Sequence, residues 1–314
     1  MRPREYAVLT LLALIWGASF LFIRVAVLEI SPFDLVFFRL GIASLVLLPV
    51  VLIRPRLIKG WQRYIPGFLL VGLFNTALPY SLFGYGEQHI PSGHASIINA
   101  TTPLFAVVLT AVLPGIVHAR LTARRGLGAL ISFAGVLVLV GPNALQGTGT
   151  LLAYGACLLA AGLYAISNVL ARMMLHDAPL LAQAFFIDFA GFLFILPFAL
   201  VSGLPQHVPS AGAIASILTL ATLGTAVAFL MFYWLLQHVG VLRTSLVTYL
   251  LPCTALVWGA VLLHESITAN VIAGLALVLA GIAIINNLFG ARVNATLAET
   301  PTPALAPESG GKTE

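Results

Sequence analysis

The sequence predicts an all-α integral membrane protein, with ten transmembrane helices arranged as two inverted five-helix repeats. Apolar residues make up 60% of the chain, charged residues make up only 8%, and the mean hydropathy is +1.05. A soluble protein would carry about three times that charged fraction. In addition, ten apolar stretches are long enough to span a bilayer, and the basic residues gather in alternate connections between them.

The apolar stretches set the expected helix boundaries. About 20 helical residues cross the hydrocarbon core, because a helix rises about 1.5 Å per residue and the core is about 30 Å thick. Helices are expected because a β-barrel would instead show strands of about ten residues with alternating polarity. The stretches are 6–28, 33–53, 65–87, 92–116, 121–141, 150–172, 178–201, 211–236, 241–263 and 267–289.

The first stretch begins like a secretory signal peptide, because Arg2 and Arg4 precede an apolar run. That run continues to about Leu28, which is too long for the apolar part of a signal peptide. We therefore expect it to be the first transmembrane helix.

The basic residues predict the orientation of the helices. Thirteen of the fifteen Lys and Arg residues lie at the N-terminus, in the tail or in alternate connections. Cytoplasmic connections carry an excess of such residues, so we expect both termini to be cytoplasmic in a bacterial-type plasma membrane. The exceptions are Arg24 and Arg39, which lie inside the first two helices. The tail, 291–314, is expected to be disordered.

The two halves of the chain share residues at an offset of 149 positions. Because each half holds five helices, the second copy must be inverted, and we expect repeats at 1–143 and 144–290. Inverted repeats place a solute site near the midplane, where the halves meet. The matches are Gln88-His89 with Gln237-His238, Ser96 with Ser245 and Pro103 with Pro252, and, after a three-residue gap, Gly128 with Gly274 and Ala134-Gly135 with Ala280-Gly281.

Four short motifs resemble those of the EamA-type branch of the drug/metabolite transporter superfamily. They are Trp16-Gly17-Ala18-Ser19-Phe20, Phe38-Arg39-Leu40, Ala100-Thr101-Thr102-Pro103-Leu104 and His264-Glu265-Ser266-Ile267-Thr268. The resemblance covers about residues 6 to 290. It implies a ten-helix transporter similar to bacterial exporters of amino acids, including aromatic ones. One departure is Ala119, where the first half often has an acidic residue, so only Glu265 remains.

The same resemblance implies that helices 1, 3, 4, 6, 8 and 9 line the solute cavity. Their midplane side chains are aromatic residues, amides and hydroxyls, which suit an amphipathic, zwitterionic or aromatic solute. Each residue alone could equally serve helix packing or an interhelical hydrogen bond, and about half of the set is expected to face the cavity. The set is Trp16, Asn75, Thr76, Tyr80, Asn99, Tyr164, Asn168, Phe229, Tyr233 and Tyr249.

Two acidic residues are candidates for coupling transport to protons. Asp188 lies in the middle of helix 7, where an Asp costs roughly 2.5 to 3.5 kcal/mol. It either carries a proton during transport or is a protonated structural residue bonded to a neighbouring helix. Glu87 lies with His89 and His94 at the outer end of helix 3. These three either relay protons or are ordinary residues of the membrane interface.

Two arginines within the first two helices are candidates for an electrostatic role. Arg24 and Arg39 are expected either to pair with the nearby Glu29 and Asp34 or to hold a carboxylate at the outer mouth.

Pro103 and Pro252 are repeat-related and fall within helices, which favours a hinge role because proline breaks a backbone hydrogen bond. Gly128, Gly135 and their partners in the second half are expected to allow close packing of helices 5 and 10.

These features favour a secondary or facilitative transporter that works by alternating access. The solute is expected to be an amino acid or a related small metabolite. An organic-phosphate or nucleotide-sugar carrier is the alternative, but it would need basic residues at the midplane. No Walker A pattern is present. We expect no cofactor and no metal, a small-molecule solute as partner, and a monomer or a homodimer.

An intramembrane enzyme and a channel are the remaining alternatives. His264-Glu265 begins like a zinc-protease motif, but position 268 is Thr, so the second histidine is missing. No Gly-x-Ser-x-Gly turn appears, and both lysines lie outside the helices. Cys157 and Cys253 lie inside apolar stretches and are expected to be small buried residues rather than a disulfide.

Overall fold

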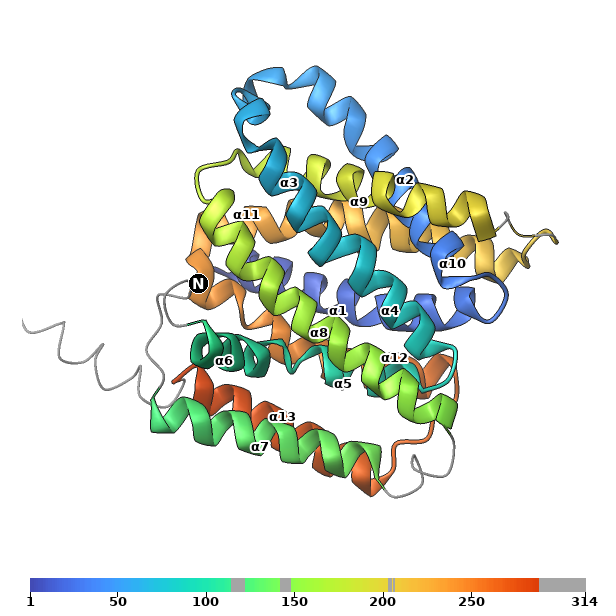
Figure 1. Ribbon diagram of the computed structural model, residues 1–314, viewed down its shortest axis with the longest axis vertical. Helices are drawn as coiled ribbons and strands as arrows, with labels where there is room; N and C mark the ends of the chain where they lie inside the picture. Colours follow the sequence, from blue (N-terminus) through green and yellow to red (C-terminus); the bar gives the residue numbers. More distant parts are fainter. Residues whose placement is uncertain (114–121, 142–147, 203–204, 206, 288–314) are drawn as a thin grey trace, which may run out of the picture.

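The computed structural model describes residues 1–113, 122–141, 148–202, 205 and 207–287. Within these residues all regular secondary structure is helical, as the sequence predicts. Figure 1 shows long helices that run back and forth across the molecule, with the start of α1 and the end of α13 on the same side. The predicted tail and the residues between helices 4 and 5, including Ala119 and Arg120, lie outside the described residues.

Every predicted apolar stretch contains helix. The elements are α1 (Pro3–Val27), α2 (Pro32–Ile53), α3 (Ile65–Gly72), α4 (Leu78–Glu87), α5 (Ser92–Asn99), α6 (Thr102–Val112), α7 (Ala123–Val140), α8 (Thr148–Met174), α9 (Leu180–Ser202), α10 (Ala211–Ala221), α11 (Ala228–Thr244), α12 (Val247–Leu262) and α13 (Ala269–Ile285). Among the described residues, eight helical segments are long and apolar enough to cross a bilayer, and α12 and α13 are shorter apolar helices.

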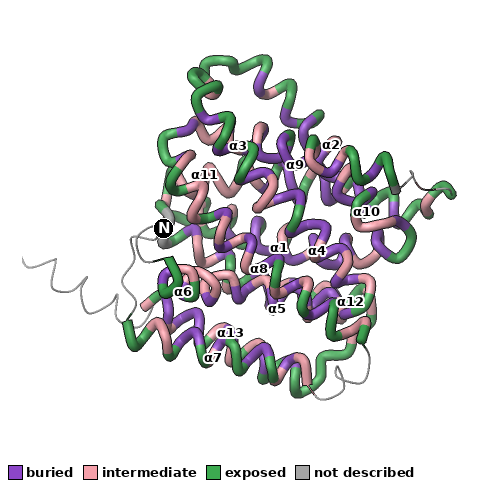
Figure 2. Tube along the Cα trace, viewed as in Figure 1, coloured by how far each residue is buried: buried purple, intermediate pink, exposed green. Residues whose placement is uncertain are grey.

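The outer surface of the bundle is apolar, and α7 shows this clearly. Leu130, Phe133 and Leu137 of α7 are 69%, 48% and 58% exposed. Figure 2 shows both exposed and buried residues along α7, which lies at the edge of the bundle. Water would disfavour such a surface, whereas the hydrocarbon of a bilayer solvates it. The surface therefore agrees with the predicted class of integral membrane protein.

The first and second halves of the chain are interleaved rather than folded separately. α1 packs against α12, α2 against α9, α4 against α8, and α7 against α13. Polar contacts reinforce the first of these pairs. The Thr254 hydroxyl donates to the Ala13 carbonyl at 2.8 Å, and the Trp258 indole donates to the Leu14 carbonyl at 3.2 Å. The core is consequently shared between the two halves.

Two π-helical turns interrupt the long helices, at Leu73–Ala77 and at Thr222–Val227. They begin 149 residues apart, which is the offset of the sequence matches. The first packs against α9 and the second against α2. A π-turn adds a residue to the helix and frees a carbonyl group, and such turns are frequent at functional sites. Thr76 and Thr225 are identical at the same offset within these turns, although they are not among the matches noted in the sequence.

One predicted helix is interrupted in the structure. The predicted helix at 92–116 breaks at Ala100 and Thr101, and Pro103 then lies in the first turn of α6, where its missing N–H is tolerated. Its repeat mate Pro252 lies inside α12, so a break accompanies only one of the two prolines. The predicted boundary between the stretches 211–236 and 241–263 is present, because Gly240 within α11 has a non-helical backbone, with φ 75° and ψ 172°.

The packing of α7 on α13 depends on glycine. A Cβ added at Gly135 would lie 2.8 Å from the Val278 nitrogen and 2.9 Å from the Gly274 oxygen, which are backbone atoms that cannot turn away. We expect Gly135→Ala to destabilise the fold by about 1–3 kcal/mol, measured as a lower thermal unfolding midpoint in detergent. Gly126→Ala in the same helix, where nothing lies within 4 Å, should leave the midpoint unchanged or raise it. Equal midpoints for the two variants would contradict this packing.

Candidate functional site

Aromatic side chains of α1 and α11 form a continuous wall inside the bundle. The ring of Trp16 lies 5.3 Å from Phe232 and 6.2 Å from Phe229, centroid to centroid. Phe229 in turn stacks on Tyr233 at 6.2 Å. Three of the predicted cavity residues are thus brought together by two helices that come from opposite halves of the chain.

A small cavity opens beside this wall, between α9, α11 and the first π-turn. It is lined by Asn75, Gln183, Asp188, Phe229 and Tyr233, together with the alkyl groups of Ala184 and Ile187. Its volume is about 10 Å³, which is room for about one water-sized group. The structure therefore joins three predicted cavity residues to Asp188, which the sequence analysis considered separately.

Asp188 is fully buried, and neither of its carboxyl oxygens has a hydrogen-bond partner within the described residues. A buried polar group without a partner costs about 1–3 kcal/mol. The structural alternative from the sequence required a bond to a neighbouring helix, and the described residues provide none. The predicted role of Asp188 in proton coupling stays a prediction.

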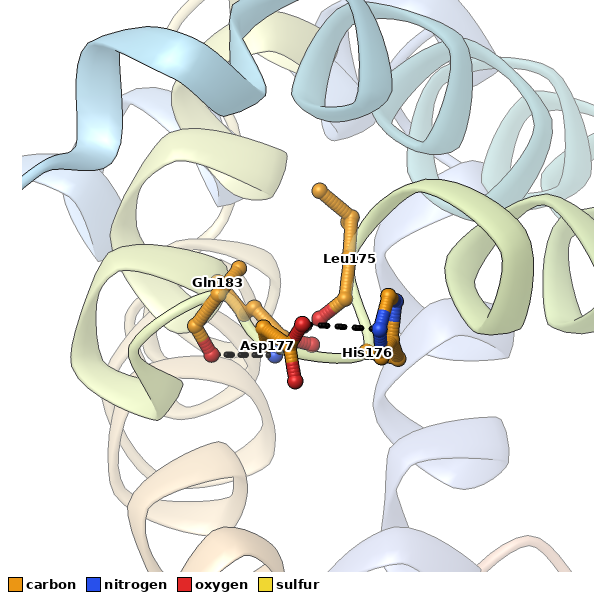
Figure 3. Close-up of polar contacts among 5 residues, drawn as sticks. Leu175, His176, Asp177 and Gln183 are labelled. Atoms are coloured by element: carbon orange, nitrogen blue, oxygen red, sulfur yellow. Dashed lines mark hydrogen bonds and ion pairs between the residues drawn. The ribbon is translucent and has the colours of Figure 1, made fainter.

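Gln183 holds the connection that leads into α9 and was missed by the sequence analysis. Its amide group donates to the Leu175 and Ala178 carbonyls at 3.1 and 2.9 Å. Figure 3 shows Gln183 beside this connection, near Leu175 and Asp177. His176 and Asp177, also labelled in Figure 3, form an exposed ion pair at 2.7 Å. Because both amide hydrogen bonds go to the connection, the carbonyl oxygen of Gln183 remains for the cavity.

Arg39 is buried and makes two contacts, neither of them with an acid. Its Nε donates to the Thr225 hydroxyl at 2.9 Å, and its guanidinium carbon lies 3.8 Å from the ring centroid of Tyr80. The predicted pairing with Asp34 is wrong, since Asp34 accepts from Ser31 at 2.7 Å instead. Thr225 suits this role because its hydroxyl donates to the Leu220 carbonyl and still accepts from the guanidinium.

Arg24 joins α1 to the end of α4. Its guanidinium donates to the backbone carbonyl of Glu87, so the predicted pairing with Glu29 is also wrong. The carboxyl group of Glu87 itself is fully buried and has no partner within the described residues. His89 is exposed, and His94 instead contacts the Tyr154 hydroxyl at 2.6 Å. A proton relay through Glu87 stays a prediction.

Two glutamates cap helices of the opposite half, on the side of the bundle away from the start of α1 (Figure 1). Glu29, after α1, accepts from the backbone N–H and the hydroxyl of Ser210 at the start of α10, at 2.6 and 2.5 Å. Glu265, after α12, accepts from the backbone N–H groups of Ser92 and Gly93 at the start of α5, at 2.8 and 3.1 Å, and from the Ser92 hydroxyl at 3.0 Å. Negative charge is favourable at a helix N-terminus.

Local backbone geometry brings Glu265 back over α12. His264 has a left-handed backbone, with φ 54°, which turns the chain directly after the helix. A Cβ at Gly259 would lie only 2.5 Å from a Glu265 carboxyl oxygen and 2.9 Å from the Ser92 hydroxyl. Glycine is therefore required for the cap. The sequence singled out Glu265 as part of a motif, but it could not show which helix receives its carboxylate.

The remaining predicted cavity residues do not line the cavity at Asp188. Tyr164 stacks on Phe83 at 6.0 Å, and the Tyr249 hydroxyl accepts from Asn286 at 2.7 Å. Asn99 is half-buried, whereas Asn168 is exposed. Asn75 is in the cavity and its side-chain oxygen accepts from Ser167 at 3.1 Å, a contact that the sequence did not indicate.

An all-helical bundle with an apolar outer surface and a small polar cavity between its interleaved halves defines a multi-pass membrane protein. The model of the EamA-like transporter family matches this chain twice, at residues 4–141 and 151–287. The chain belongs to this family, and it is a membrane transporter as the sequence motifs suggested.

Several relatives are named as transporters. An "Uncharacterized transporter" of Archaeoglobus fulgidus is 28% identical over 90% of this chain and 98% of its own length. A "Probable terminal-alkyne amino-acid exporter" of Streptantibioticus cattleyicolor is 30% identical over 88% and 92%. A "Probable amino-acid metabolite efflux pump" of Salmonella typhimurium is 26% identical over 91% and 95%.

A crystal structure also shares the fold. It covers 92% of this chain and 99% of its own chain, with a TM-score of 0.62 and 20% sequence identity. At that identity the similarity concerns the fold alone.

The Glu29 cap should depend on pH. Hydrogen bonds from the hydroxyl and then the backbone N–H of Ser210 lower the pKa of Glu29 below its ordinary 4.5. A carboxyl with a lowered pKa stabilises the fold above its unfolded pKa, and this contribution is lost as the pH falls through the folded value. Glu29→Gln should therefore lower the unfolding midpoint at pH 7, and the difference should shrink as the pH falls below 4.5. A difference that does not change with pH would contradict this role.

Proposed function

We propose that this transporter exports amino acids, with aromatic or other hydrophobic ones as the first candidates. The single observation that carries the proposal is the cavity at Asp188, where aromatic faces, amides and a carboxyl group meet between the two halves. Such a site suits a solute that has both a charged and an apolar part. Two relatives named for amino-acid or amino-acid metabolite export, at 30% and 26% identity, support the same class of solute.

We further propose ten crossings in two inverted halves. The helix pairings support this, because α1 with α12 and α6 with α8 are equivalent contacts once the two repeats are exchanged. The two π-turns, 149 residues apart, support it as well. With the basic connections in the cytoplasm, the Glu29 and Glu265 caps lie at the outer face.

The two caps close the outer side in this arrangement, because each joins the two halves there. In the sequence, the repeat-equivalent positions are Ala178 for Glu29, at the offset of 149, and Ala119 for Glu265, at the offset of 146 that follows the gap. Neither alanine can accept a hydrogen bond through its side chain. The difference favours the state that is closed outside, and opening outward must break both caps.

The rate at which a buried cysteine is labelled measures how often the outer side opens. Cys157 of α8 is fully buried, and a Cβ at Gly86 of the other half would collide with its sulfur atom. In a Cys253→Ser background, a membrane-impermeant maleimide added outside should label Cys157 slowly. We expect labelling to become several-fold faster when Glu29→Gln and Glu265→Gln are combined, because the halves then separate more often.

Glu5→Gln is the matched control for labelling. Glu5 accepts from the backbone N–H of Arg2, so it caps its own helix and links no halves. If the double variant and this control label at the same rate, the caps do not hold the outer side closed. If labelling occurs only from the inner face, the proposed orientation is wrong.

Export is tested by tolerance and by exchange. Cells that express the protein should tolerate toxic amino-acid analogues such as p-fluorophenylalanine better than cells with the empty vector. In proteoliposomes, unlabelled phenylalanine loaded inside should accelerate uptake of radiolabelled phenylalanine. A channel would show no such acceleration, and unchanged tolerance across a broad panel of analogues would count against amino-acid export.

A further inference from the structure

Arg39 and Asp188 occupy equivalent positions in the two halves, since their numbers differ by 149. Each lies on a helix that packs against the π-turn of the other half, with α2 on Thr222–Val227 and α9 on Leu73–Ala77. The repeat therefore places opposite charges at two matching sites within the bundle interior. Only the tertiary structure can show whether the two sites are used in the same way.

The two matching sites differ in how their charges are satisfied. Arg39 is held by the Thr225 hydroxyl and the Tyr80 ring. Thr76, which matches Thr225, donates its hydroxyl to the Gly72 carbonyl at 2.7 Å. Asp188 therefore receives nothing from its π-turn, and it forms no ion pair within 4 Å in the described part of the chain. The helix that carries Arg39, α2, nevertheless packs against α9, which carries Asp188.

The cavity is lined by the Asp188 carboxyl group, which has no hydrogen-bond partner within the described residues, and by groups that accept hydrogen bonds or attract cations. The Gln183 amide hydrogens are already bonded to the α9 connection, so its oxygen remains. The stacked rings of Phe229 and Tyr233 form another wall, and ring faces attract cations. A group with several N–H donors and a positive charge fits this lining, and an ammonium group matches the water-sized volume.

We propose that Asp188 binds the ammonium group of the transported solute inside this cavity. The inference rests on the proposed transport of a small solute and specifies which part of that solute is recognised. The positive charge of Arg39 lies nearby, so a solute that carries a carboxylate next to its ammonium group is complementary to both charges. A zwitterionic amino acid is favoured over a simple amine, and an acid without an ammonium group is disfavoured.

Three compounds with one shared ring test this directly. L-Phenylalanine has both charges, phenethylamine lacks the carboxylate, and 3-phenylpropionate lacks the ammonium group. Binding to the purified full-length protein in detergent is measured as a shift of the thermal unfolding midpoint over a titration. We expect phenylalanine to bind best, then phenethylamine, with 3-phenylpropionate weakest. In Asp188→Asn, affinity for the two ammonium compounds should fall by roughly tenfold or more, and 3-phenylpropionate should be unaffected.

Asp34→Asn is the matched control, because Asp34 is also a buried aspartate with an unpartnered oxygen but lies at the start of α2. It should leave all three affinities unchanged. Binding of 3-phenylpropionate as tight as that of the amines, no binding of any ammonium compound, or unchanged phenylalanine binding in Asp188→Asn would overturn the inference. The three-compound series on the unaltered protein decides the question even if Asp188→Asn does not fold.

The same measurements separate the inference from the proposed function. If ammonium compounds bind through Asp188 but proteoliposomes show no amino-acid exchange, the ammonium site stands and amino-acid export is wrong. If amino acids are exchanged but binding ignores Asp188, export stands and the carboxyl group serves another purpose.

Discussion

Close approach between helices of opposite halves is the constraint on which the rest of this structure depends. In a bilayer the hydrophobic effect does not press one apolar helix against another, so association relies on van der Waals packing at small residues and on interhelical hydrogen bonds. Gly135 meets the backbone of α13, and Gly72 lies where a Cβ would be 2.7 Å from Ala190. Because these contacts join the halves, both halves must be present before the cavity at Asp188 exists.

The same close packing makes unsatisfied polar groups conspicuous. Most buried hydroxyl groups in the described residues donate to a carbonyl of their own helix, as Thr76 and Ser81 do at 2.7 and 2.8 Å. By contrast, Asp188 and Glu87 are fully buried, and their carboxyl oxygens have no hydrogen-bond partners within the described residues. Asp188 alone of these two lines the cavity described at α9 and α11. A low-polarity interior leaves such a group poorly stabilised until something binds to it.

Two carboxylate caps join the halves at one end of the bundle. Glu29 and Glu265 each reach across to the first turn of a helix from the other half. Alternating access needs the two ends to open in turn. Contacts built from a few hydrogen bonds at exposed or half-buried helix ends can break and reform, whereas the glycine packing of α7 on α13 cannot separate without losing many contacts at once. The Glu29 and Glu265 caps are therefore suited to the opening and closing steps of a transport cycle, and the α7–α13 packing to a part that stays together.

The amino-acid sequence by itself determined the class of protein. Composition, the length of the apolar stretches and the clustering of basic residues depend only on the bilayer as solvent, and each can be read without knowing any contact. The helix ends were predicted to within a few residues, including the boundary at the non-helical Gly240, except where the Ala100–Thr101 break precedes Pro103.

The tertiary structure alone decided which polar residues meet. Arg39 was expected beside Asp34 because they are near in sequence, yet its partner Thr225 is 186 residues away. Gln183 and Ser167 belong to no recognisable motif. Glu265 belongs to one, but the sequence does not show which helix it caps. Such contacts depend on which helices cross and how the π-turns rotate their side chains. That information resides in the packing of the two halves, because hydrogen bonds need partners within about 3 Å and sequence separation does not measure that distance.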